Sequence, residues 1–185
     1  MKRYLLLAAL LAVPSLVYSQ AIAFSGKGPV GSLTATASYI FGESEGGTDH
    51  ALWGWSVAPE INITRRLGLQ AEIGSYYERI LPGEKRLLMS AGPRYSFVPM
   101  FKLWPFVYAE GGEMRLTFKN STYRDWDPVA RVGIGFESHL SRNLSVTVVP
   151  AEYLAHNLDA GGWSHDYSAH AGFTYNFYHG HGPLE

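Results

Sequence analysis

The chain of 185 residues contains no cysteine. This absence excludes a disulfide framework and a lipid anchor on an N-terminal cysteine. A secreted domain of this composition must therefore be held together by its core or by closure of a sheet.

Long apolar runs are also missing after residue 19, where none approaches the about 20 residues that a membrane-spanning helix needs. A large basic excess is missing as well. Once Lys2 and Arg3 are removed with the leader described below, 13 Lys and Arg face 16 Asp and Glu, which gives a net charge of −3. This balance excludes a strongly basic nucleic-acid binder. Because long apolar runs are missing, any insertion into a membrane must use strands.

The first twenty residues, MKRYLLLAALLAVPSLVYSQ, have the order of a secretory signal peptide. Lys2 and Arg3 precede an apolar run, Leu5 to Val13, which is too short to span a bilayer as a helix. Pro14 ends the run, and small or modest residues then lead to Ser19. We expect a signal peptide over residues 1–19, a barrel domain over residues 20–178 and a flexible tail over residues 179–185.

Alternation of period two dominates the remainder of the chain, and helical spacing is nowhere sustained. For example, Trp53, Trp55 and Val57 alternate with Gly54 and Ser56. Eight such runs follow one another, and most approach the about 9–11 residues that a tilted transmembrane strand requires. They span residues 33–41, 53–63, 67–74, 87–97, 104–116, 131–137, 144–153 and 166–177.

Two of the runs contain residues at which a β-bulge can reverse the phase. Gly111 and Gly112 interrupt the fifth run, and Pro150 interrupts the seventh. The sequence therefore leaves the facing of Glu113 and Glu152 open.

The connections between the runs alternate in length. An up-and-down meander with short turns at one end and long loops at the other is typical of an outer-membrane barrel. The sequence therefore predicts an all-β fold, an eight-stranded antiparallel transmembrane β-barrel with short periplasmic turns and longer extracellular loops. The short connections are residues 64–66, 98–103 and 140–143, and the long ones are residues 41–51, 78–85, 117–127 and 155–164.

Two features favour lipid over water as the outer solvent. A soluble surface usually carries Lys and Glu, whereas Lys27, Lys85, Lys102 and Lys119 all lie in connections or at strand ends. The aromatic residues also form two bands, as anchoring at two membrane interfaces predicts. One band comprises Phe97, Phe101, Trp104, Phe136, Tyr175 and Phe177, and the other comprises Tyr39, Phe41, Trp53, Tyr153, Trp163 and Tyr167.

Charged residues on the polar faces of the runs predict a network inside the barrel. A charge facing lipid would cost about 2–4 kcal/mol near the midplane, and eight strands enclose only enough space for side chains. Counting from the turns places Glu72 near Arg94 and Glu110 near Arg131. We expect these residues to plug the lumen as a structural network of Glu60, Glu72, Arg94, Glu110 and Arg131.

The segments SVAPEINITRRLGLQAEIGSYY, ARVGIGFESHLSRNLSV and HAGFTYNF, in this order, are similar to the small eight-stranded outer-membrane barrels. That group, the outer-membrane β-barrel domain family, includes the transmembrane domain of OmpA and OmpX. The resemblance implies contact with outer-membrane lipid and lipopolysaccharide, and insertion by the barrel-assembly machinery. The last run resembles the C-terminal assembly signal of such barrels through Gly172, Phe173, Tyr175 and Phe177, although the chain continues to Glu185.

Several patterns with catalytic or metal-binding residue types have a simpler interpretation. Neighbours on a strand point to opposite faces, so Ser164-His165-Asp166 cannot form a triad through its side chains. His139 and Ser141 have the spacing used by a barrel lipid A deacylase, but they fall at the periplasmic end. Glu60 and Glu72 could be paired carboxylates of a glycosidase, yet a lumen blocked by Arg94 leaves no room for a sugar. His165, His170, His179 and His181 are potential metal ligands, and the last two fall in the tail.

The sequence thus indicates a monomeric integral outer-membrane protein with a closed or very narrow polar lumen and a structural, surface-interaction or envelope-integrity role. We expect no enzyme activity, no cofactor and no bound metal or nucleic acid, and the ligand of the loops is not encoded in a recognisable pattern. A small porin-like channel is the alternative. A lipid A-modifying barrel and a soluble periplasmic barrel are less favoured.

Overall fold

The computed structural model describes residues 30–43, 49–78, 84–118, 126–158 and 162–178. The expected signal peptide and the expected tail lie outside these residues. All regular elements in the described part of the chain are strands, and no helix there is long and apolar enough to cross a membrane. The strands are β1 (Gly31–Glu43), β2 (Asp49–Asn62), β3 (Leu67–Glu78), β4 (Glu84–Ser96), β5 (Leu103–Phe118), β6 (Trp126–His139), β7 (Leu144–Leu158) and β8 (Gly162–Phe177).

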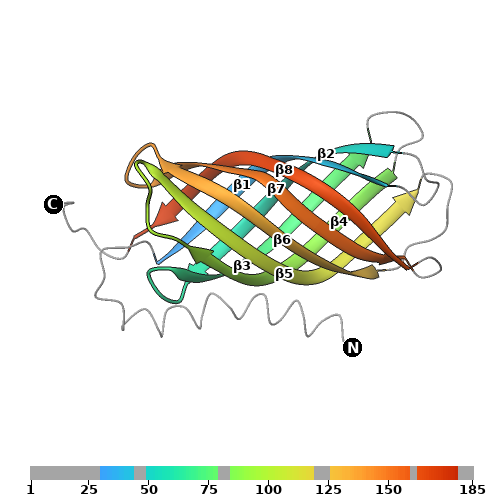
Figure 1. Cartoon of the computed structure of the whole chain (residues 1–185), viewed down its shortest axis with the longest axis horizontal. Coiled ribbons are helices and arrows are strands. Elements are labelled where there is room, and N and C mark those ends of the chain that lie inside the picture. The colour runs from blue at the N-terminus through green and yellow to red at the C-terminus, as the bar shows by residue number, and fades with distance from the viewer. Residues whose placement is uncertain (1–29, 44–48, 79–83, 119–125, 159–161, 179–185) are drawn as a thin grey trace.

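The eight strands form one closed antiparallel barrel in sequence order, as the sequence predicts (Figure 1). Closure is made by β1 and β8, whose register runs from Gly31 opposite Phe177 to Gly42 opposite Asp166. The strands contain 12–16 residues. A tilted strand needs only about 9–11 residues to cross a bilayer, so the ends of these strands would project beyond it. Closure leaves no unpaired sheet edge, which is the condition for burying strands in lipid.

The three short connections lie together at one end of the barrel, where β8 also ends (Figure 1). Two of them are closed in the same way by a hydroxyl. Thr64 Oγ1 accepts a hydrogen bond from the Leu67 amide at 2.9 Å, and Ser141 Oγ accepts one from the Leu144 amide at 3.2 Å. These local bonds satisfy backbone donors within the turn, so each hairpin is short and its register is set locally.

The two faces of the sheet differ in polarity as the alternation predicts. Small polar residues point inward, as in β1, where Ser32, Thr34 and Ser38 are buried. Large apolar residues point outward, and Trp53, with 54% of its surface accessible, is typical. Both expected aromatic bands contain outward-facing rings, and at the loop end the rings of Tyr39 and Trp53 lie 4.8 Å apart edge to face. The outer surface is therefore apolar and the buried charged groups lie in the interior, the reverse of a soluble barrel.

The structure settles the two positions whose facing the sequence leaves open. The register of β7 shifts by one residue against both neighbours, between Val148 and Ala151 on the β6 side and between Val149 and Glu152 on the β8 side, so a bulge at Pro150 turns Glu152 inward. The fifth run has no such shift, because β5 keeps a constant register against β4 on both sides of the glycine pair. Glu113 consequently points outward and is exposed.

Candidate functional site

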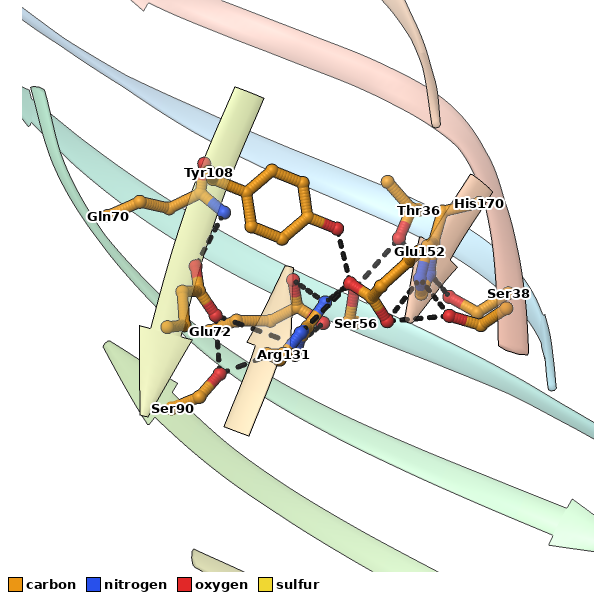
Figure 2. A network of polar contacts seen from close by, with 12 residues as sticks. Thr36, Ser38, Ser56, Gln70, Glu72, Ser90, Tyr108, Arg131, Glu152 and His170 are labelled. Carbon is orange, nitrogen blue, oxygen red and sulfur yellow. Dashed lines mark hydrogen bonds and ion pairs between the residues drawn. The ribbon is translucent and has the colours of Figure 1, made fainter. Parts of the chain in front are cut away.

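The lumen contains the largest polar cluster of the described barrel, and Arg131 lies at its centre. The Arg131 guanidinium is enclosed by three carboxylates from different strands. Its Nη1 lies 2.8 Å from Glu72 and 3.7 Å from Glu110, and its Nε donates to Glu152 at 2.9 Å. Figure 2 shows Glu72 and Glu152 on either side of Arg131, and because Glu72 lies on β3 and Arg131 on β6, the cluster joins strands that are not neighbours in the sheet.

Hydroxyl and imidazole groups satisfy the remaining acceptors of Glu152 (Figure 2). Tyr108 donates its hydroxyl hydrogen to one carboxylate oxygen, and Ser168 donates to the other at 2.6 Å. The Nε2 atom of His170 lies 3.1 Å from the same oxygen as Ser168, and its Nδ1 lies 2.6 Å from the hydroxyl of Ser38 on β1. A buried charge is tolerated when its hydrogen bonds are complete, and Glu152 meets this condition.

Glu110 is held in a comparable way from the other side of the cluster. The amide of Gln70 donates to one carboxylate oxygen at 2.9 Å, and the hydroxyl of Ser90 donates to the other at 2.5 Å. Glu110 also pairs with Arg131 in the β5–β6 register. The cluster has three carboxylates for one guanidinium, so hydroxyl and amide donors stabilise charge that Arg131 alone does not neutralise.

A second charged cluster lies closer to the short-turn end and is centred on Arg94. Its Nη1 lies 2.7 Å from Glu60, and its Nη2 lies 2.9 Å from Glu137. The Phe106 ring covers the guanidinium, whose central carbon lies 3.8 Å from the ring centroid. Arginine stacks on aromatic faces while its fork binds carboxylates, and here one residue does both.

The expected proximity of Glu72 and Arg94 is wrong. Arg94 is opposite Gly68 in the β3–β4 register, while Glu72 is opposite Ser90, and Glu72 pairs with Arg131 instead. Residue counts from two different turns do not align because neighbouring strands of a barrel are staggered. The other expectation, Glu110 near Arg131, agrees with the direct pairing described above. All five sequence-predicted lumen residues lie inside, divided between two clusters.

A small cavity lies between the two clusters. Its volume is about 30 Å³, enough for about two water molecules. Thr34, Thr36, Ser56 and Thr147 line it, together with apolar residues such as Phe106 and with residues of both charged clusters.

An apolar layer lies between the Arg131 cluster and the loop end of the barrel. It contains Ile40, Leu52, Leu88 and Leu154, each at most 1% accessible. Beyond it, Arg86 forms a buried ion pair with Asp166, and His156 lies 3.5 Å from the same carboxylate. The apolar layer thus lies between the Arg131 cluster and the Arg86–Asp166 pair, and its side chains offer no hydrogen-bonding group to water or ions.

Sequence reasoning missed several of these residues. Glu137, Asp166 and His170 stand on the polar faces of their runs, so the alternation itself contains the signal. Glu152 was hidden by the bulge at Pro150. The inward Leu88 gives no such signal, because an apolar residue beside apolar neighbours does not show which face it occupies.

The patterns with catalytic residue types do not form a catalytic site. His165 points outward and its Nδ1 lies 2.5 Å from the Tyr153 hydroxyl, whereas Asp166 points inward to Arg86. His139 stacks near Trp104 with ring centroids 5.3 Å apart, and the hydroxyl of Ser141 is used by its turn.

The remaining carboxylate and histidine candidates are separated as well. Glu60 and Glu72 belong to different clusters, so they do not face a common substrate space. His170 is buried inside while His165 lies outside, and among the described residues no group of three metal-ligating side chains is suited to a metal ion. His179 and His181 lie outside the described residues.

The last run contributes its aromatic residues to the outer surface. Phe173, Tyr175 and Phe177 are all about half exposed, and the rings of Tyr175 and Phe177 meet edge to face at 5.3 Å. Gly172 faces inward beside β1, where a Cβ atom would lie 1.9 Å from the carbonyl oxygen of Ala35. These four residues, expected as an assembly signal, thus lie in the strand that closes the barrel.

No sequence family matches the chain, and no characterised protein matches it by sequence. Solved structures do match. Neisserial surface protein A superposes with a TM-score of 0.71 at 14% identity, covering 82% of this chain and all of that protein. The N-terminal β-barrel domain of Pseudomonas aeruginosa OprF gives 0.52 at 18% identity, with coverage of 82% and 100%.

A third match extends the comparison to another organism. The attachment invasion locus protein Ail of Yersinia pestis, in a complex with the heparin analogue sucrose octasulfate, gives a TM-score of 0.50 at 13% identity and covers 78% of this chain and 96% of its own. At these identities the similarity concerns the fold. The chain has the fold of the small eight-stranded outer-membrane β-barrels.

Proposed function

We propose that this chain is an integral outer-membrane protein with a closed lumen and a structural or surface-interaction role in the cell envelope. The observation that carries the proposal is the inversion of polarity across the sheet. Aromatic and aliphatic side chains such as Trp53, Ile134 and Phe173 face outward with 45–57% of their surface accessible, while carboxylates and guanidinium groups are buried inside. Water would penalise this arrangement and lipid would not.

The closed lumen supports a role at the surface rather than in transport. The Arg131 cluster, the Arg94 cluster and the apolar layer occupy successive levels of the interior. Contacts with other molecules would then be made by the connections at the long-loop end and by the lipid-facing surface, which a rigid barrel holds in place. The partners would be outer-membrane lipid and lipopolysaccharide, with the barrel-assembly machinery acting during insertion on a monomer.

A narrow channel is the second candidate, and the cavity between the two charged clusters is the observation in its favour. Water in this cavity would lie beside Glu72 and Arg94, which are among the residues that line it. The apolar layer opposes conduction, because Leu52, Leu88 and Leu154 would have to move apart before an ion could pass. We therefore infer a barrel that is closed at rest.

The absence of enzyme activity is part of the same proposal. The buried carboxylates are engaged with Arg94 and Arg131, and His139 and Ser141 do not face each other across a common space. Mass spectrometry of lipid A after expression tests this directly. Loss of an acyl chain in cells that express the protein would contradict a non-enzymatic role.

Fractionation of expressing cells tests the location. We expect the protein in the outer-membrane fraction, resistant to extraction by carbonate. We also expect faster gel migration without heating than after boiling, because a closed barrel resists unfolding by detergent at room temperature. Release by carbonate or salt would contradict membrane integration, and identical mobility before and after boiling would contradict a stable barrel.

A further inference from the structure

Charged residues on the outer face of the barrel are confined to one sector. Across the strand positions whose side chains the structure describes, the outward-facing Lys, Arg, Asp and Glu residues are Lys85, Glu113 and Arg115. All three lie on β4 and β5, toward the end that carries the long connections. The other sectors at this level carry aromatic rings instead, among them Trp53 and Tyr167.

The register places the two cations together. Lys85 is opposite Thr117, and Arg115 is opposite Leu87, so the two cations are diagonal neighbours on the same face. Diagonal neighbours lie about 7–8 Å apart, a distance that long side chains bridge easily. Glu113 follows on the same face of β5, two residues further from the loop end, beside Met89.

Neither cation is neutralised by the described part of the protein. The ammonium group of Lys85 lies 5.2 Å from the centroid of the Tyr77 ring, which holds the lysine at the surface without supplying negative charge. The Nε atom of Arg115 is buried and has no hydrogen-bond partner among the described residues. The Arg115 side chain as a whole is only partly buried and forms no ion pair with the described residues, so its positive charge can attract an external anion.

The depth of the patch indicates the chemistry of that acceptor. A cation on the lipid face is unfavourable near the midplane and is tolerated near the interface. The loop end of the barrel meets the interface at which lipid headgroups present phosphate. Phosphate matches the point charge of lysine and the planar fork of arginine.

The surface next to the cations suits the chains of a lipid better than a second copy of this barrel. Ala91, Gly111 and Ala130 are aligned side by side across β4, β5 and β6 on the outer face. A Cβ atom added at Gly111 would meet nothing within 4 Å. Acyl chains below a bound headgroup can therefore approach the backbone, while two neighbouring cations would repel the same cations of a second copy.

We propose that Lys85 and Arg115 form a binding site for the phosphate of an outer-leaflet lipid, whose acyl chains lie against Ala91, Gly111 and Ala130. Glu113 then faces the positive partner of that phosphate, an amine of the headgroup or a divalent cation. This site rests on the proposed orientation of the barrel in the outer membrane.

The test compares two double variants that remove equal charge from opposite ends of the barrel. K85Q/R115Q removes the proposed site. K102Q/R142Q is the matched control, because its cations lie at the short-turn end and Arg142 also covers a tyrosine ring, that of Tyr178. Each purified barrel, in detergent micelles, is titrated with diphosphorylated lipid A, and bound lipid is counted by native mass spectrometry.

We expect saturable binding to the unchanged protein and to K102Q/R142Q, and binding at least about tenfold weaker to K85Q/R115Q. Inorganic phosphate at the same concentration should not compete, because the acyl chains contribute to binding. R115K keeps the charge and should retain binding. It shows whether a change of side chain at position 115 by itself disturbs folding, and so controls for misfolding of K85Q/R115Q. Equal binding to all variants would overturn the site, as would an equal loss in both double variants.

Two further outcomes separate this site from its alternatives. A concentration-dependent dimer that K85Q/R115Q abolishes would overturn the lipid site in favour of self-association. If every variant remains in the outer-membrane fraction with heat-modifiable mobility but binds lipid A equally, the lipid site fails and the proposed function stands. If the unchanged protein is found outside the membrane, the proposed function fails first.

Discussion

Arg131 is the residue on which the interior depends most. Its guanidinium contacts Glu72, Glu110 and Glu152, and its side chain has no accessible surface. Removal of one partner of a buried charge network is more harmful than absence of the whole network, because the remaining charges stay buried without compensation.

R131M should therefore lower the free energy of unfolding by about 3–5 kcal/mol. Urea titration of the barrel refolded in lipid vesicles measures this loss. R142M is the control, because Arg142 lies at a turn and is held there by a contact with the Tyr178 ring, and its loss should cost about 1 kcal/mol or less. Equal stability of the two variants would show that the Arg131 cluster does not hold the barrel together.

Two glycines, Gly172 and Gly111, differ in the space around them and therefore provide a second variant and its control. A Cβ atom at Gly172 would collide with the β1 backbone at Ala35, whereas one at Gly111 would project into open space. G172A should reduce the fraction of protein that refolds to the heat-modifiable form, because β8 must move away from β1. G111A should refold as well as the unchanged protein, and a comparable defect in both would contradict the steric explanation.

At the scale of single strands, β7 shows where sequence reasoning reaches its limit. Alternation predicts the existence and order of all eight strands because one face meets lipid and the other meets the lumen. It does not show where an extra residue reverses the phase. Pro150 signals a bulge in β7, and the bulge is present, but Gly111 and Gly112 give a similar signal in β5 without one. A glycine leaves both outcomes open, whereas a proline lacks the donor that the ladder needs.

The final strand, β8, is expected to matter for insertion. Phe177 is opposite Gly31 at the start of β1 and packs against Tyr175, so it lies where the barrel closes. F177A should reduce the amount of protein in the outer membrane and leave export to the periplasm intact, as measured by fractionation. F136A removes a similarly exposed ring from β6. If F136A reduced the amount of protein in the outer membrane as much as F177A does, the result would indicate a general need for aromatic residues at the interface and no special role of Phe177.

For the whole molecule, the fold followed from the sequence more completely than the interior did. The charged residues of the lumen were recognisable because polar groups on a strand of a membrane barrel must face inward. Their pairing was not, because it depends on the stagger between strands, and Arg94 consequently pairs with Glu60 and Glu137 rather than Glu72. The apolar layer was missed because Leu52 and Leu88 interrupt the inward polar pattern without any mark in the alternation.

The central claim is a membrane barrel that does not conduct. Its most direct test is the current through planar lipid bilayers after insertion of the purified, refolded protein, with heat-modifiable mobility confirming the folded state. Because both charged clusters and the apolar layer fill the lumen, we predict no steady current above that of the bare bilayer at moderate voltage. A steady current proportional to voltage, appearing in uniform steps as protein inserts, would contradict the closed lumen and establish a channel instead.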